Sequence, residues 1–317
     1  MSSEIAVRTQ GLTKRFGRHV AVNELDLEIK SGEVFGLIGP NGAGKTTLIR
    51  MLATAEQPTL GDIYFRGQLL ERNQTNADLK RLIGYLPDDF PLYEDLTVWE
   101  YLNYFARLYQ LRQPRRRQRL LDVLELVQLT HKRRSSVASL SRGMKQRLGL
   151  ARTIIHEPIL LLLDEPVSGL DPLARVQFRE LITVLREAGM TIVISSHILS
   201  DLAELCTSVG IMELGFLVEN TSLQQLYQDL SQQQIQISTL GDLPSLELEL
   251  RRCPHIEEWQ VNPDMRQVKA RFSGGQQEAA ELLRSLLAAH IPIYNFQCQQ
   301  EDLETIFLDK LDHKQVS

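Results

Sequence analysis

Two short segments of the sequence carry the side chains best suited to phosphate chemistry. The first, GPNGAGKTT, runs from Gly39 to Thr47 and fits the pattern G-x-x-x-x-G-K-S/T. Its glycines let the backbone N–H groups of residues 41–46 curl around phosphate oxygens. Lys45 is expected to reach the β- and γ-phosphates of a nucleotide, and the Thr46 hydroxyl to bind Mg²⁺. A glycine-rich turn without a ligand is the alternative. The expected nucleotide-binding residues are Gly39, Pro40, Asn41, Gly42, Ala43, Gly44, Lys45, Thr46 and Thr47.

The second segment, ILLLLDEPVSGLDP, places two carboxylates directly after five aliphatic residues that predict a buried strand, Ile159 to Leu163. Asp164 is expected to hold Mg²⁺, directly or through water, and Glu165 to polarise the attacking water. A dry strand would keep both groups fixed and strengthen their electrostatic effect. Helix capping or a solvated loop is the alternative for two acids in this position. The phosphate loop elsewhere in the chain favours the chemical interpretation.

Strands that alternate with helices must bring these two segments together. An apolar strand, Glu33 to Gly39, precedes the phosphate loop, and a helical pattern follows from Lys45 to Leu52. The positive end of that helix would face the bound anion. Alternating elements over residues 1–220 predict one α/β unit with a largely parallel sheet. Its other expected elements are strands Ile5–Val7, Leu25–Ile29 and Thr191–Ser196, and helical stretches from Val98 to about Leu129, Ser141 to His156 and Leu173 to Ala188.

A glutamine-rich stretch separates this unit from the rest of the chain. We interpret residues 221–232 as a linker and residues 233–317 as a small α+β accessory domain. The expected order of its elements is β-α-β-β-α-β, which is typical of a ferredoxin-like fold. One more helix is expected from Asp302 to about Leu311.

Composition excludes several classes of protein. The net charge of −5 gives no general reason to expect nucleic acid as a partner. The three cysteines are scattered, which favours a reducing compartment over a disulfide framework. Zinc-ligand spacing is absent from the sequence. The first residues lack the apolar region of a signal peptide, and no apolar run is long enough to span a bilayer.

Further motifs give the sequence a family resemblance. The segment LSRGMKQRLGLARTI begins at Leu140, and SGLD and the histidine of SSH follow the acidic strand. With the phosphate loop and LLLLDEP, these motifs closely resemble ATP-binding cassette (ABC) ATPases over about the first 220 residues. The resemblance implies a P-loop NTPase cassette with a RecA-like core and with antiparallel β and helical subdomains. It also implies ATP hydrolysis with ATP and Mg²⁺ as cofactors, and a head-to-tail dimer, homo- or heteromeric.

The resemblance also implies roles for single residues. Phe16 looks like the aromatic that stacks on adenine, although a core phenylalanine is the alternative. Ser141 and Gly143 look like signature residues that contact the γ-phosphate on the opposite subunit, and Ser141 also fits a helix cap. Asp171 looks like the residue that couples the two sites of the dimer. His197 matches a switch histidine that contacts the γ-phosphate, so Glu165 and His197 form the expected catalytic pair.

Two positions depart from the family pattern. Arg142 and Met144 replace a glycine and a glutamine of the commonest signature. Arg142 would either add positive charge near the nucleotide or point to solvent. Asp88 stands where the family usually carries the glutamine that senses Mg²⁺ and the attacking water. It would bind a Mg²⁺-ligated water at shorter reach, or it is a solvated loop acid like Asp89.

The ending QEDLETIFLDKL and the segment LPDDFPLYEDLTVWEYL resemble subunits of ABC-2-type exporters. This resemblance implies an ATPase at the cytoplasmic face of a membrane, peripheral to a separate permease and without a nucleic-acid partner. Two alternatives remain open. One is an importer ATPase whose C-terminal domain is regulatory, and the other is a soluble cassette ATPase in translation or DNA repair.

Overall fold

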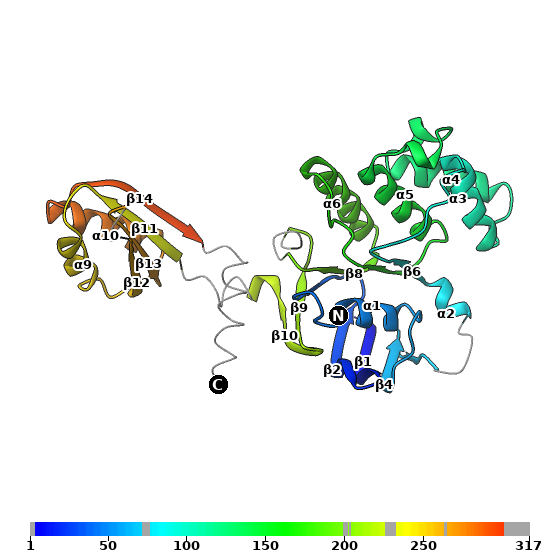
Figure 1. Cartoon of the computed structure of the whole chain (residues 1–317), viewed down its shortest axis with the longest axis horizontal. Helices are drawn as coiled ribbons and strands as arrows, with labels where there is room; N and C mark the ends of the chain where they lie inside the picture. Colours follow the sequence, from blue (N-terminus) through cyan, green and yellow to red (C-terminus); the bar gives the residue numbers. More distant parts are fainter. Residues whose placement is uncertain are drawn as a thin grey trace. The chain divides into compact units, whose positions relative to one another are not determined.

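The computed structural model describes residues 4–71, 77–198, 202, 204–225, 233–262 and 265–300. The chain divides into two compact units, Met1–Leu223 and Gln224–Ser317 (Figure 1). None of the described helices combines the length and the apolar surface needed to traverse a bilayer.

A six-stranded sheet in the order β10-β9-β3-β8-β7-β6 forms the centre of the first unit. Neighbouring strands are parallel except for β10, which runs antiparallel to β9. Every residue of β3, β7 and β8 is buried, as expected for parallel strands covered on both faces. The strands are β3 (Val34–Ile38), β6 (Ile83–Leu86), β7 (Leu160–Leu163), β8 (Thr191–Ser196), β9 (Ser208–Glu213) and β10 (Phe216–Ser222).

An antiparallel sheet in the order β2-β1-β4-β5 covers one face of the central sheet, with helix α1 between them (Figure 1). Side chains from both sheets and from α1 share one core, among them Leu27, Phe35, Ile49 and Phe65. The elements are β1 (Ile5–Phe16), β2 (His19–Lys30), α1 (Lys45–Leu52), β4 (Leu60–Phe65) and β5 (Gln68–Leu69).

Helices cover the opposite face of the central sheet (Figure 1). The helical pattern after Val98 forms two helices, α3 and α4, because Gln110 just beyond α3 adopts a left-handed φ of 61°. A capping box of Thr97 and Glu100 starts α3. The helices on this face are α3 (Val98–Leu108), α4 (Arg115–Leu126), α5 (Arg142–Ile154) and α6 (Pro172–Glu187), with 3₁₀ turns at Thr130–Lys132 and Val137–Ser139. The short helix α2 (Ala77–Arg81) lies instead on the side of the antiparallel sheet, where Leu79 packs against the core shared by the two sheets.

The first strand is much longer than the sequence predicts. The alternation of polar and apolar residues indicates Ile5 to Val7, whereas β1 continues to Phe16. Register shifts between Thr9 and Leu12 and between Leu12 and Lys14 are the reason. Such irregularities break the two-residue period on which the sequence interpretation depends.

The described part of the second unit contains two helices and an antiparallel sheet in the order β12-β13-β11-β14. Its own core includes Ile235, Ile237, Val268, Phe272 and Leu286. The element order is that of a ferredoxin-like motif. Residues 226–232 and the helix expected from Asp302 lie outside the described residues. The elements are β11 (Gln233–Thr239), α9 (Leu243–Leu250), β12 (Ile256–Asn262), β13 (Gln267–Phe272), α10 (Gln276–Ala288) and β14 (Ile293–Gln300).

The C-terminal end of α5 is held by cationic and aromatic groups. Arg119 on α4 donates to the carbonyl oxygens of Ile154 (2.6 Å) and Ile155 (3.1 Å). The His156 ring stacks on Tyr109 with centroids 3.9 Å apart, and its Nε2 lies 3.1 Å from the carbonyl oxygen of Ile83. Burial lowers the pKa of His156, and the charge of Arg119 acts in the same direction. This site therefore favours a neutral imidazole.

We predict that this neutral histidine makes the fold sensitive to acid. Below pH about 6.5 the unfolded chain protonates His156 while the folded chain resists, so stability falls as pH falls and is retained above that value. His156→Phe keeps an aromatic ring against Tyr109 and removes the titration. Its denaturant midpoint should fall less between pH about 7.5 and about 5.5 than that of the unsubstituted protein. The matched control is His131→Phe, at an exposed histidine. Equal pH dependence in all three proteins would contradict the prediction.

Candidate active site

The loop after β3 bends tightly against two neighbouring strands. Gly42 and Gly44 adopt positive φ angles of 84° and 103°. A Cβ atom on Gly44 would lie 2.2 Å from the carbonyl oxygen of Ala21, and one on Gly39 would lie 2.2 Å from that of Met212. Only glycine permits these close approaches, so the glycines fix the shape of the loop.

Lys45 places a buried positive charge inside this loop. Its residue is 5% exposed, and its Nζ donates to the carbonyl oxygens of Gly39 (2.6 Å) and Pro40 (3.2 Å). Helix α1 begins at the same residue, so its unpaired N–H groups add positive potential. A cavity of about 260 Å³ opens here, lined by His19, Ala21, residues 41–47, Asp88 and Glu165. The cavity suits an anion with several phosphate oxygens.

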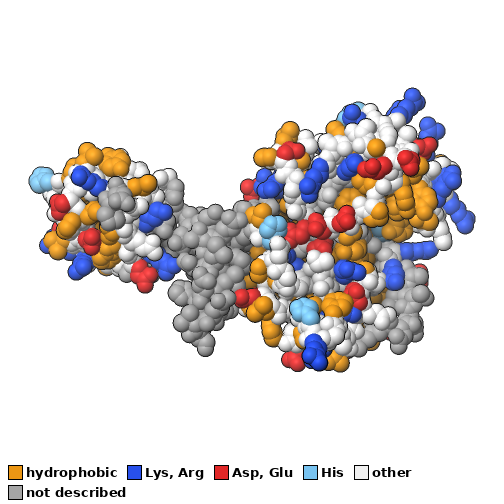
Figure 2. All heavy atoms as spheres, viewed as in Figure 1, with side chains coloured by type: hydrophobic (Ala, Val, Ile, Leu, Met, Phe, Trp, Pro, Cys, Tyr) orange, Lys and Arg blue, Asp and Glu red, His pale blue; other side chains and the backbone are white. Residues whose placement is uncertain are grey.

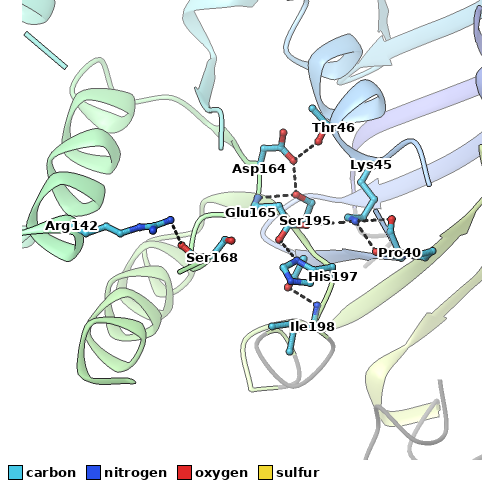
Figure 3. Close-up of polar contacts among 12 residues, drawn as sticks. Pro40, Lys45, Thr46, Arg142, Asp164, Glu165, Ser168, Ser195, His197 and Ile198 are labelled. Atoms are coloured by element: carbon cyan, nitrogen blue, oxygen red, sulfur yellow. Dashed lines mark hydrogen bonds and ion pairs between the residues drawn. The ribbon is translucent and has the colours of Figure 1, made fainter. Parts of the chain in front are cut away.

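Asp164 is a buried carboxylate held by two hydroxyl groups. It is 1% exposed, and its Oδ1 accepts from Ser195 Oγ (2.7 Å) and Thr46 Oγ1 (3.2 Å) (Figure 3). Burial raises the pKa of Asp164, and the two hydroxyl donors oppose that shift. Among the described residues, no Lys or Arg forms an ion pair with it. A buried carboxylate of this kind calls for a cation.

The groups around Asp164 fit Mg²⁺ by their chemistry. Carboxylate and hydroxyl oxygens are the hard ligands that this ion prefers. The described residues contain no cluster of three or more His, Cys, Asp or Glu side chains that could hold a metal. Mg²⁺ bound by Thr46 and Asp164 would therefore need phosphate oxygens as further ligands, which is its usual binding mode at nucleotides.

Glu165 faces both Lys45 and His197 (Figure 3). Its Oε1 lies 3.5 Å from Lys45 Nζ, and its Oε2 lies 2.8 Å from His197 Nδ1. The backbone of Glu165 has a φ of 48°, and its N–H donates to Ser195 Oγ at 2.9 Å. The side chain is therefore held at the cavity by contacts from α1, β8 and the residue after β8. Figure 2 shows acidic side chains gathered in the middle of the visible face of the first unit.

Asp88 lines the same cavity from the segment after β6. Partial desolvation raises its pKa, and the charges of Glu165 and Asp89 add to the shift. Arg142 and His197 act in the opposite direction. Asp88 thus belongs to the acidic side of the site, and its role toward Mg²⁺ stays a prediction.

The signature residues form the start of α5. Ser141 is the N-cap and its Oγ accepts from the Met144 N–H at 3.3 Å, so the helix-cap interpretation holds. Gly143 is buried, and a Cβ there would lie 2.8 Å from the Cβ of Ala174. The Arg142 side chain is exposed but not free, because its Nη2 donates to the Ser168 carbonyl oxygen at 3.0 Å, and its positive charge acts on Asp88 in the cavity wall. Of the described residues that line the cavity, none is a signature residue of the same chain.

Two other expected site residues have local roles as well. Asp171 is the N-cap of α6 and accepts from the Ala174 N–H at 2.9 Å. Phe16 is 48% exposed, so the core alternative is wrong. The Lys14 ammonium lies 4.8 Å from its ring centroid, and Phe16 pairs across the hairpin with His19, a residue of the cavity wall.

Sequence reasoning missed Ser195 and His19. Ser195 joins Asp164 to the backbone of Glu165 through one hydroxyl. The available signal was its position as the first serine of SSH, directly after the apolar run of a buried strand. His19 carried no signal, because nothing near it in the sequence marks it as part of a cavity.

Comparison with known proteins identifies the family. Residues 22–168 match the family model described as ABC transporter. The linearmycin resistance ATP-binding protein LnrL of Bacillus subtilis is 30% identical over 304 residues, covering 96% of this chain and 97% of LnrL. An uncharacterized ABC transporter ATP-binding protein of Synechocystis, sll0415, is 40% identical over 208 residues. That match covers 65% of this chain but 58% of the relative.

A solved structure of the ATP-binding cassette MJ0796 matches with a TM-score of 0.62 and 25% identity, covering 68% of this chain and 98% of that one. That structure is of a dimer in a post-hydrolysis state, bound to ADP and Pi. The expected P-loop cassette fold is thereby confirmed. The chain belongs to the ABC transporter family, as an ATP-binding subunit whose cassette is an ABC ATPase.

Proposed function

We propose that this subunit hydrolyses ATP at the cavity between the phosphate loop and Glu165, and that the resulting dimer cycle drives a separate membrane permease. This proposal is carried by Lys45 and Glu165, which line one cavity, and by His197, which contacts the Glu165 carboxylate. Phosphoryl transfer to water depends on cationic groups that stabilise the phosphate charge and on a residue that positions the attacking water, and Lys45 and Glu165 fit these two tasks.

Each group has a defined task in the reaction. The loop N–H groups and Lys45 bind the phosphates, and Phe16 offers an exposed ring for the adenine. Glu165 accepts a proton from the water as the water oxygen bonds to the γ-phosphorus and the bond to the β–γ bridging oxygen breaks, giving ADP and inorganic phosphate, and the proton then passes to solvent. His197 holds the Glu165 carboxylate in place. Mg²⁺, held by Thr46 and Asp164, would neutralise part of the phosphate charge.

The exposed signature supports a dimer. Ser141 and Arg142 are exposed and line no part of this chain's own cavity. A second cassette arranged head to tail would bring its signature helix to this cavity, and the dimeric MJ0796 structure offers a precedent. ATP then favours closure because it contacts both subunits only when they meet.

Export is the direction that the relatives favour. LnrL, a resistance protein, is similar along almost the whole chain, including the second unit. We infer a peripheral subunit at the cytoplasmic face of a membrane, bound to an exporter permease of the ABC-2 type. Specific binding of a small metabolite to residues 233–300 would instead favour an importer with a regulatory domain.

The first prediction concerns Glu165→Gln. This change keeps the size of the side chain but removes the charge that polarises water, so ATP turnover should fall by about 100-fold or more. ATP binding, measured by equilibrium titration, should persist. Glu187→Gln, at an exposed position on α6, is the matched control and should leave turnover unchanged. Normal turnover in Glu165→Gln would refute the proposed role.

The second prediction concerns Asp88→Gln. Removing a negative charge from the cavity should raise the Mg²⁺ concentration needed for half-maximal activity. Maximal turnover should stay within about tenfold of the original, because Asp88 is not assigned to the water. Asp95→Asn, at an exposed carboxylate farther along the same segment, is the control. If the Mg²⁺ requirement and the rate both stayed the same, Asp88 would be a solvated loop acid.

The third prediction concerns the partner. Glu165→Gln should accumulate the ATP-bound dimer, since hydrolysis no longer reopens it. Purified from detergent-solubilised membranes with ATP and Mg²⁺, it should carry a stoichiometric membrane protein with several spanning segments, identified by mass spectrometry. Ribosomes or DNA-repair factors in place of that protein would point to a soluble cassette function.

A further inference from the structure

Arg142 makes a two-part contact with the segment that follows the acidic strand. Its Nη2 donates to the carbonyl oxygen of Ser168 at 3.0 Å (Figure 3). At the next residue, Gly169, an added Cβ would lie 2.5 to 2.6 Å from three atoms of the guanidinium. The guanidinium therefore lies against Gly169, in space that any other residue would fill. Gly169 also has a φ of 64°, which favours glycine.

The backbone of Ser168 continues this link to the site. Its N–H donates to the carbonyl oxygen of Glu165 at 3.1 Å and closes a turn. Glu165 sits in the left-handed region, with a φ of 48°, where a non-glycine residue is strained. Neighbouring groups must hold such a conformation in place. The Glu165 backbone makes two hydrogen bonds that do this: its carbonyl oxygen accepts from the Ser168 N–H, and its own N–H donates to Ser195 Oγ.

The position of Arg142 argues against a role in helix stability. It is the first residue of α5, where the positive end of the helix disfavours a cation. Its side chain is exposed and has no ion pair among the described residues. The same segment is fixed at its other end, where Arg175 Nε donates to the Leu170 carbonyl oxygen at 3.1 Å. Arg142 is thus the contact that ties residues 168–169 to the signature helix.

We propose that Arg142 is a positioning residue for Glu165, acting through the backbone N–H and carbonyl groups of Ser168. The inference rests on the proposed function, in which Glu165 orients the attacking water. The link from Arg142 to Glu165 connects two parts of one chain, and in the proposed dimer these parts belong to different nucleotide sites. The signature helix faces the nucleotide of the second subunit, whereas Glu165 serves the chain's own nucleotide. A displacement at the start of α5 therefore reaches the carboxylate of the same chain through two hydrogen bonds.

The test compares Arg142→Ala, Arg142→Lys and Gly169→Ala in the full-length chain. Arg142→Ala should lower kcat about fivefold, the size expected for one partly exposed charged hydrogen bond. The Kd for ATP should stay within about twofold, and the melting temperature should not change. Arg142→Lys should recover part of the loss, because it keeps a donor but not the flat contact. Gly169→Ala should lower kcat as well, because its methyl group displaces the guanidinium. Arg179→Ala, on the surface of α6, is the control.

A double-substitution cycle separates positioning from a direct role. If Arg142 acts through Glu165, then Arg142→Ala should cause no further loss of turnover in the Glu165→Gln background. Equal losses in both backgrounds would overturn the inference, as would a weaker Kd for ATP with unchanged kcat. Unchanged kcat in Arg142→Ala, with turnover that still depends on Glu165, would overturn this inference alone. A protein whose turnover does not depend on Glu165 would overturn the proposed function and this inference together.

Discussion

The first unit is organised around a carboxylate that is buried without a permanent cationic partner in the described structure. Asp164 is almost fully enclosed, and among the described side chains only the hydroxyls of Thr46 and Ser195 bind its carboxylate. Burial destabilises the ionised form of such a carboxylate unless a cation binds beside it. The central sheet positions the groups that stabilise this carboxylate. Strands β7 and β8 are fully buried and parallel, so their carboxyl ends bring Asp164 and Ser195 side by side next to α1.

The same sheet edge explains why a strained residue is tolerated beside Asp164. Glu165 must turn away from the strand at once to face Lys45 and His197, and the left-handed φ achieves this within one residue. The strain is confined by hydrogen bonds from β8 and from the following turn. The buried strands β7 and β8 fix the backbone on either side of the site, and the turn at Glu165 orients its carboxylate. Catalytic groups placed in this way need little rearrangement when substrate binds.

Where residues of one site are contiguous in the chain, the sequence alone was enough to predict their roles. The phosphate loop is one continuous segment with a strand before it and a helix after it, so its shape and chemistry follow from local rules. Asp164 and Glu165 were predicted because an aliphatic strand precedes them directly. Ser195 and the Arg142–Ser168 contact depend on elements that meet only in the folded chain, and no local pattern encodes their distance. The full length of β1 was missed because its bulges remove the alternation that reveals a strand.

Helix α5 is fastened at both of its ends. Arg142 ties its first residue to the turn that carries Glu165, and Arg119 of α4 ties its last carbonyl groups to the helical part of the unit. Its 13 residues span about 20 Å. A helix of this length resists bending and compression, so α5 moves as a rigid element. A displacement of α4 would therefore be transmitted along α5 to the turn that carries Glu165.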